Sequence, residues 1–219
     1  MTPRAATAAK RSNTSQVEDE NSIAASAAGR ASSGIFIKEV RIRNFRCLLS
    51  VDVELDMLTV LIGQNNSGKT SFLNALFAAI GAGQRIISND DILLRKGEVS
   101  VPKERAVIID ILIKPTDDQG KIMDVFPSGS PWLELWGNGV VQDDNEHDLV
   151  AIRTSFKWNT VKGEYALERR FLKDWHPDGN KWEESKPVEK IGAVTAQQIE
   201  PLALYLLDAK RDIAEDLRT

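Results

Sequence analysis

One stretch, Gly63–Thr70, constrains the fold more than any other part of the chain. It reads Gly-Gln-Asn-Asn-Ser-Gly-Lys-Thr and fits the phosphate-loop pattern G-x-x-x-x-G-K-[ST] at every fixed position. An apolar run, Leu58–Ile62, precedes it, and a helical pattern follows, with one apolar face made of Phe72, Leu73, Leu76, Phe77 and Ile80. The motif requires this order of strand, loop and helix, which counts against the alternative of a chance glycine-rich turn.

The residue types in this stretch suit phosphate binding. Glycines let the backbone curl so that successive N–H groups point inward, and a helix start adds N–H donors and the positive end of its dipole. We expect Lys69 to reach the β- and γ-phosphates of a nucleotide and the Thr70 hydroxyl to coordinate Mg²⁺. The remaining contacts are expected from Gly63, Asn65, Asn66, Ser67, Gly68 and Ser71.

Length and composition exclude some classes of protein. The 219 residues suffice for one domain, or for one domain with a lobe. No apolar run approaches the roughly 20 residues that cross a membrane, so no membrane association is expected. The net charge of −4 gives no overall nucleic-acid footprint, although a local basic patch stays open. Cys47 is the single cysteine, which is typical of a reducing cytoplasm.

The chain divides into a tail and one domain. Residues 1–33 are rich in small and polar residues and predict a disordered tail, whereas residues 34–219 predict a folded domain. Alternating apolar and charged residues at Val40–Arg43 and Val51–Leu55 predict an antiparallel strand pair. The nearly continuous apolar run Leu58–Ile62 predicts a central strand covered on both faces.

Further elements follow the loop. Ser88–Leu94 predicts a short helix, Ala106–Ile113 a strand, and Leu149–Trp158 with Tyr165–Leu172 a hairpin. Arg211–Arg218 predicts a last helix, and Gly81 is expected to end the helix after the loop. Together these elements predict an α/β P-loop fold, a mixed sheet with an antiparallel β lobe. The order differs from the strict strand-helix alternation of small GTPases and nucleotide kinases.

Two stretches resemble a known ATPase family. Ile42–Arg46 (Ile-Arg-Asn-Phe-Arg) and Leu61–Leu76 resemble the N-terminal half of an ABC/SMC-type ATPase head, in the branch of RecF-like and OLD (overcoming lysogenization defect) proteins, which are AAA-type ATP-dependent endonuclease-like. Tyr205–Ile213 also resembles a segment of OLD-type ATPases. The resemblance covers residues 35–80 and, less closely, 199–218.

The resemblance implies an ATP-binding head that forms a homo-oligomer, with ATP and Mg²⁺ sandwiched between two heads. It implies that Arg43, Asn44, Phe45 and Arg46 lie near the nucleotide and that Asp208 lies near the metal. It also implies work in DNA repair or anti-phage defence, coupled to an effector subunit or domain. The alternatives for these side chains are a core aromatic at Phe45 and solvated strand charges at Arg43 and Arg46.

The chain departs from this family in two motifs. The sequence contains neither a Leu-Ser-Gly-Gly motif nor four apolar residues followed by Asp-Glu. Val107–Asp110 and Leu204–Asp208 only approximate the second pattern. Phosphoryl transfer needs metal, positioned water and charge stabilisation together. We therefore expect an incomplete head that binds nucleotide but does not hydrolyse it alone.

Other readings stay open at this point. The acidic run Asp143–Asp148, which includes His147, is either a metal site or a solvated loop. Basic residues interleaved with Trp158, Trp175 and Trp182 suit DNA contact, a strand surface that packs on a partner, or core packing. A nucleotide-sensing scaffold subunit that restrains or recruits an effector is the main functional alternative. A P-loop kinase or GTPase is less consistent, because no Asn-Lys-x-Asp motif is present.

Overall fold

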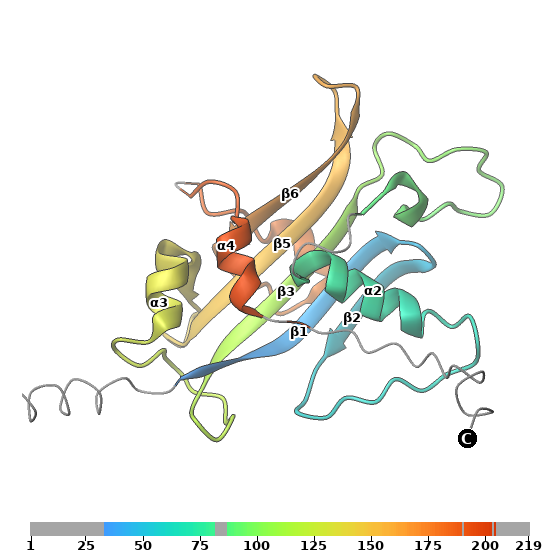
Figure 1. The fold of residues 1–219 in the computed structure, drawn as a ribbon. Helices are drawn as coiled ribbons and strands as arrows, with labels where there is room; N and C mark the ends of the chain where they lie inside the picture. Colours follow the sequence, from blue (N-terminus) through green and yellow to red (C-terminus); the bar gives the residue numbers. More distant parts are fainter. Residues whose placement is uncertain (1–32, 82–86, 190, 203, 205–219) are drawn as a thin grey trace, which may run out of the picture.

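The computed structural model describes residues 33–81, 87–189, 191–202 and 204. A single six-stranded sheet dominates them, in the order β2-β1-β3-β5-β4, with β6 also paired to β5, and every pairing of these strands is antiparallel (Figure 1). The strands are β1 (Gly34–Phe45), β2 (Leu48–Glu54), β3 (Val107–Thr116), β4 (Val140–Gln142), β5 (Asp148–Asn159) and β6 (Glu164–Leu172). β4 and β6 share one edge of β5 by pairing with its two ends.

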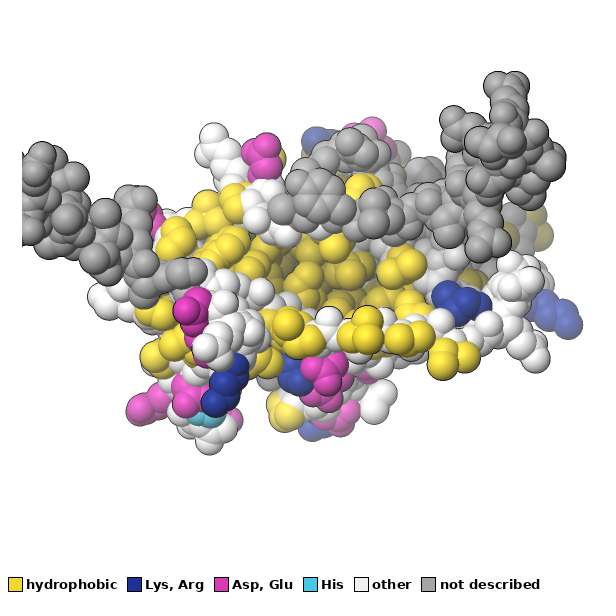
Figure 2. Space-filling view, turned by 60° about the horizontal axis from the view of Figure 1, so that its bottom comes forward, with side chains coloured by type: hydrophobic (Ala, Val, Ile, Leu, Met, Phe, Trp, Pro, Cys, Tyr) yellow, Lys and Arg dark blue, Asp and Glu magenta, His cyan; other side chains and the backbone are white. Residues whose placement is uncertain are grey.

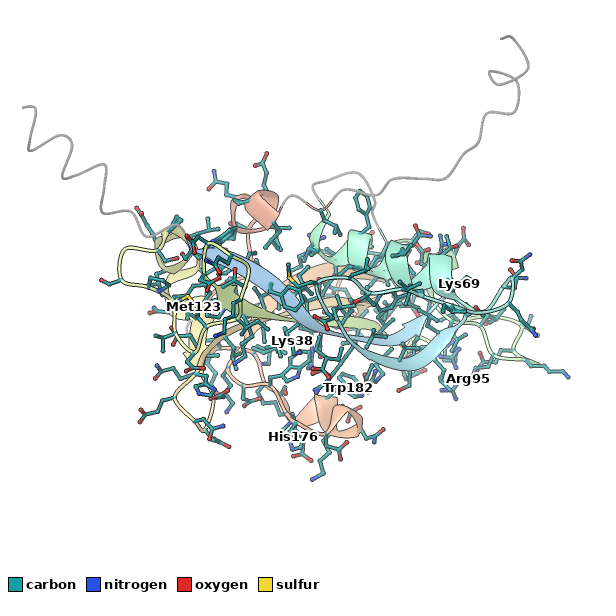
Figure 3. All side chains as sticks on the ribbon, turned by 90° about the horizontal axis from the view of Figure 1, so that it is seen from below. Lys38, Lys69, Arg95, Met123, His176 and Trp182 are labelled. Carbon is teal, nitrogen blue, oxygen red and sulfur yellow. The ribbon has the colours of Figure 1, made fainter. Side chains whose placement is uncertain are left out.

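Short helices complete the fold. They are α2 (Lys69–Ile80), α3 (Pro131–Trp136) and α4 (Ala196–Ile199), with 3₁₀ turns η1 (Asn89–Asp91), η2 (Gly137–Gly139), η3 (Gly179–Glu184) and η4 (Glu200–Leu202). α2 and α4 cross the same face of the sheet (Figure 1), and η3 lies on the opposite face (Figure 3). In the part of the chain described here, no helix is long and apolar enough to span a membrane.

The face of the sheet under α2 carries the main apolar core. Alternate residues of β1 and β3 point into it, because side chains on a strand alternate between faces. The core contains Val40, Ile42, Ile109, Ile111 and Ile113 from the strands, with Phe72, Ala75, Leu76, Ala79 and Ile80 from α2 and Trp136 and Ile199 from α3 and α4. Of the apolar stripe predicted for the helix after the loop, Phe72, Leu76 and Ile80 are buried, whereas Phe77 is partly buried and Leu73 is exposed.

The opposite face carries charged residues in register. Arg41 lies opposite Asp52 in β2 and opposite Asp110 in β3, and Asp110 lies opposite Arg153 in β5. Arg153 binds Asp110 through two hydrogen bonds, Nε to Oδ1 at 2.8 Å and Nη2 to Oδ2 at 2.6 Å. Burial raises the pKa of the Asp110 carboxyl, and the Arg153 guanidinium opposes that shift. Buried charges of this kind are tolerated only when they are paired.

Residues 173–187 cover this charged face. Arg43 donates to the Gly179 carbonyl, and Arg153 donates to the carbonyls of Trp182 and Ser185. Figure 3 shows Trp182 and His176 across the sheet from Lys69. The Trp175 ring lies 4.0 Å from the Arg41 guanidinium, and the Trp182 ring lies 5.0 Å from that of Arg153. Backbone carbonyls and aromatic rings thus satisfy arginines that would otherwise be buried at a cost.

The far end of α2 is tied to β6. Arg169 donates to the carbonyl oxygens of Ala78 at 3.0 Å and Ala79 at 2.9 Å, which the last turn of a helix leaves free. Thr154 also donates to the Ala79 carbonyl. Burial lowers the pKa of Arg169. These contacts hold the helix that follows the phosphate loop in place on the sheet.

Most of the predicted elements are confirmed. Val40–Arg43 and Val51–Leu55 pair antiparallel within β1 and β2, although β2 ends at Glu54. The hairpin of Leu149–Trp158 and Tyr165–Leu172 is present as β5 and β6. The strand predicted over Ala106–Ile113 is β3, which continues through Pro115 to Thr116. The predicted α/β class with its antiparallel lobe is therefore correct.

The central strand predicted over Leu58–Ile62 is wrong for the described residues. This segment belongs to none of the strands, and Leu58, Val60 and Ile62 are 83%, 67% and 91% exposed. Leu61 alone of these five residues packs against the core. Its composition suits a buried strand, but a strand needs neighbours to pair with, and the described residues supply none here.

Two smaller expectations also changed. The helix predicted over Ser88–Leu94 is reduced to the 3₁₀ turn η1, capped by Ser88. Gly81 does end α2, but in an extended conformation with φ −64° instead of a left-handed one. The predicted tail up to residue 32, Asp208 and the helix over Arg211–Arg218 lie outside the described residues.

The charged face generates a test of stability. Substituting Arg153→Ala leaves the Asp110 carboxylate buried without its bidentate partner, and we expect a loss of about 3–5 kcal/mol in the free energy of unfolding. Arg170→Ala is the matched control, because Arg170 lies beside Arg153 but pairs with Glu168 at a more exposed site, and it should cost under about 1 kcal/mol. Urea unfolding at pH 7 measures both, and equal losses would contradict the account of a buried pair.

Candidate functional site

The phosphate loop forms a tight bend at the start of α2. Gly68 adopts φ 95° and Asn66 φ 67°, both in the left-handed region that glycine and asparagine tolerate best. The Ser67 N–H donates to the Gln64 carbonyl, and α2 begins at Lys69 without a side-chain cap or an acidic residue in its first turn. The free N–H groups of that first turn and the positive end of the helix dipole therefore remain available to an anion.

A cavity of about 330 Å³ opens at this bend. It is lined by Cys47, Asn65, Asn66, Ser67, Gly68, Lys69, Thr70 and Ser71. A second hollow of about 420 Å³ adjoins it and has mostly apolar walls, from Leu48, Val51, Val53, Val60, Leu61, Ile62 and Phe72, with Gly63, Ser67, Gly68 and Lys69 shared with the loop. Phosphate-binding chemistry thus lies beside an open apolar surface.

The Lys69 side chain folds back over the loop. Its ammonium donates to the carbonyl oxygens of Gly63 at 2.8 Å and Gln64 at 2.7 Å, and lies 3.4 Å from the Ser67 hydroxyl. Figure 3 shows Lys69 at the start of α2. A lysine ammonium is a point charge with three donors, and it can exchange these carbonyls for phosphate oxygens without moving far.

The residues around the Asn-Phe-Arg motif, Arg43 to Arg46, were predicted to lie near the nucleotide together with the phosphate loop, but their side chains do not join the loop residues at the cavity. Arg43 is buried on the charged face, where it binds Asp52 at 2.6 Å. The Asn44 amide donates to the Ala106 carbonyl, and Phe45 is fully buried in the core. Arg46 pairs with Asp91 at 2.7 Å. None of these four side chains lines the cavity, so their predicted contact with a nucleotide stays a prediction.

Cys47 is the cavity residue that sequence reasoning missed. It follows Arg46 in the turn between β1 and β2, and its thiol lies 3.4 Å from the Ser71 hydroxyl. The predicted strand pair did imply a turn at this position. The sequence held no sign, however, of which end of the sheet the phosphate loop would reach.

The other candidate constellations have structural explanations. Asp143 accepts N–H groups of Asn145 and His147 and so shapes a tight turn, and Asp148 accepts the Phe126 N–H. Among the described residues, no cluster of three or more His, Cys, Asp or Glu side chains could hold a metal ion. Trp175, Trp182 and Trp158 are each partly buried and lie against the cations of Arg41, Arg153 and Lys103, the last at 4.4 Å.

The crowding at Gly68 generates a second test. A Cβ added there would lie 2.7 Å from Leu48 Cδ2 and 3.3 Å from Cys47 Sγ, in addition to the strain of a positive φ. Gly97 has nearly the same φ, 92°, but nothing lies within 4 Å of an added Cβ. We expect Gly97→Ala to cost about 1–2 kcal/mol through backbone strain alone, and Gly68→Ala to cost clearly more. Thermal and urea unfolding compare the two variants. Equal losses in the free energy of unfolding would mean that the turn at Cys47 and Leu48 can move to accommodate the added Cβ.

Comparison with known proteins adds sequence relatives to this geometry. A family model described as AAA ATPase domain matches residues 36–215. The DNA double-strand break repair Rad50 ATPase of Methanocaldococcus jannaschii is 28% identical over 107 residues, which cover 48% of this chain and 10% of that protein. The OLD nuclease of Thermus scotoductus is 40% identical over 45 residues, which cover 20% of this chain and 8% of that protein. The chain thus matches about a tenth of the length of these curated relatives.

Solved structures show weaker likeness. The recombination mediator RecF with ATP is 15% identical with a TM-score of 0.35, over 64% of this chain and 28% of that one. An SMC ATPase structure is 16% identical with a TM-score of 0.42, over 84% of this chain and 92% of that one. The resemblance to RecF-like and OLD-type ATPases that Ile42–Arg46 and Leu61–Leu76 suggest is confirmed by the family model and the two curated relatives. Since that model covers most of the chain, the protein belongs to the AAA ATPase domain family.

Proposed function

We propose that this chain is the ATP-binding part of a RecF/OLD-like ATPase that acts in DNA repair or in defence against phage. The observation that carries the proposal is the cavity at the start of α2, where Lys69, the loop and the free N–H groups of a helix converge. Those groups suit the triphosphate of a nucleotide. The relatives named for double-strand break repair and for nuclease activity support the DNA-related setting.

Mg²⁺ fits this site only together with the nucleotide. Thr70 is among the residues that line the cavity, and no Asp or Glu is among them. Because Mg²⁺ prefers charged oxygen ligands, phosphate oxygens would have to supply most of the charge, with Thr70 as the protein ligand. When bound, the metal would neutralise phosphate charge, while Lys69 and the backbone N–H groups hold the phosphates in place.

The same lack of a carboxylate in the cavity supports binding without turnover by this chain alone. A water that attacks the γ-phosphate must be oriented by a side chain, and the lining residues offer no general base. We therefore assign water activation to residues outside the described part of the chain or to a second head. If a second head supplies this function, the two heads must meet over the nucleotide.

The surface beside the cavity supports such a meeting. Val60 and Ile62, which line the apolar hollow next to the cavity, are 67% and 91% exposed, and Leu58, two residues before Val60, is 83% exposed. Figure 2 shows hydrophobic side chains gathered in a broad band across this side of the molecule. Contiguous exposed apolar surface usually marks an interface. In the proposal, this interface belongs to the ATP-dependent head dimer or to an effector coupled to it.

A nucleotide-sensing scaffold with little hydrolysis is the second candidate. The absence of a carboxylate from the cavity lining favours it equally. Steady-state ATP turnover of the full-length protein separates the two, because an ATPase must turn over when dimerised, whereas a scaffold should dimerise with ATP and turn over negligibly. Light scattering after gel filtration, with and without ATP, reports the dimer in the same samples.

The loop lysine provides the direct test. We expect Lys69→Ala to weaken binding of a fluorescent ATP analogue by roughly tenfold or more at unchanged circular dichroism, because a charge-assisted contact to phosphate is lost. Lys186→Ala is the matched control, since the Lys186 ammonium also binds a backbone carbonyl, that of Glu183, but follows η3 on the opposite face. Equal binding by wild type and Lys69→Ala would overturn the proposed function.

A further inference from the structure

The turn between β1 and β2 forms the second wall of the cavity. A Cβ on Gly68 would clash with Leu48 and touch the Cys47 thiol, so the turn and the loop are in direct contact. The Cys47 thiol also donates to the Ser71 hydroxyl at 3.4 Å. A small displacement of this turn would therefore change the shape of the space in which phosphates are expected to lie.

The backbone at this turn includes two residues in an unfavourable conformation, which needs stabilising contacts. Asn44 and Arg46 adopt φ 57° and 51°, in the left-handed region. An arginine has no side-chain chemistry that favours this region, unlike asparagine. Strained residues of this kind persist where the surrounding structure holds them.

Asp91 stabilises the conformation of Arg46 through two hydrogen bonds. Its carbonyl accepts the Arg46 N–H at 2.7 Å, and its carboxylate accepts Arg46 Nε, also at 2.7 Å. Its other carboxylate oxygen accepts the Ser88 N–H at 3.0 Å, which fixes the side chain within η1. Two residues further on, the Leu93 N–H donates to the Asn44 carbonyl. Asp91 is itself only 3% exposed, so the carboxylate acts from inside the protein.

We infer that Asp91 is a positioning residue for nucleotide binding, acting through Arg46 on the β1–β2 turn that walls the phosphate cavity. This inference rests on the proposed function. In this arrangement the Arg46 guanidinium is engaged by Asp91 and serves the site by setting the turn. The turn in turn sets the distance between Cys47 and the phosphate loop.

The test compares two buried carboxylates. Asp91→Asn keeps size and one acceptor oxygen but removes the charge that holds Arg46. Asp110→Asn is the matched control, because Asp110 is equally buried and also bound by an arginine, but lies on the opposite face of the sheet. In the full-length protein, we expect Asp91→Asn to weaken binding of a fluorescent ATP analogue about tenfold, and Asp110→Asn to leave it within about twofold while lowering thermal stability.

Cys47 reports the position of the turn independently of binding. It is the single cysteine of the chain, so alkylation by N-ethylmaleimide, followed by intact mass, reads this site alone. Without nucleotide, Asp91→Asn should be alkylated several-fold faster than wild type and Asp110→Asn. If Asp91→Asn does not fold, Arg46→Gln replaces it, with Arg46→Lys expected to restore both readouts in part, because it keeps the charge.

The outcomes separate this inference from the proposed function. Failure of wild type to bind ATP, or equal binding by Lys69→Ala, contradicts the proposed function and with it the positioning role. Normal dependence on Lys69 with wild-type affinity and alkylation in Asp91→Asn overturns the positioning role alone. A lowered melting temperature as the sole effect would mean that Asp91 is merely structural.

Discussion

The alternation of β1 and β3 between two unlike faces is the constraint on which the structure depends. Val40 and Ile42 of β1 and Ile109, Ile111 and Ile113 of β3 lie in an apolar core on one face, and Arg41 and Asp110, which lie between them, point to the other face. α2 can bury its stripe only on the apolar face, so the loop that precedes it must arrive at that side of the sheet. The charged face lies on the other side of the sheet from the cavity, and carbonyls within residues 173–187 accept hydrogen bonds from its arginines.

The phosphate loop was predictable because its chemistry is local. The spacing of Gly63, Gly68 and Lys69 specifies both the bend and the donors, and the helix that follows has its apolar stripe within the same sequence window. The hairpin of β5 and β6 was predictable for the same reason, since two alternating runs with a turn at Gly163 pair with each other. In each case, the partners of an element lie next to it in sequence.

Expectations that depended on distant partners failed or stayed open. Leu58–Ile62 has the composition of a buried strand, but burial depends on neighbours that the described residues do not supply. Arg43 and Arg46 share a motif, yet one lies on the charged face and the other in a left-handed turn held by Asp91. Side chains alternate between the two faces of a strand, and this alternation places Arg43 on the face opposite the phosphate loop. The positive φ of Arg46 could not be predicted from the sequence, because arginine rarely adopts such a φ.

The Arg169 contacts at the far end of α2 have an electrostatic consequence for the loop. A helix of this length is roughly 18 Å long and carries partial charges of opposite sign at its ends. Arg169 places a partly buried cation at the negative end, while the positive end opens on the cavity. An anion in the cavity would complete a line of alternating charge along the helix axis. The β5–β6 hairpin, which is far from the phosphate loop in sequence, thus becomes part of the electric field at that loop.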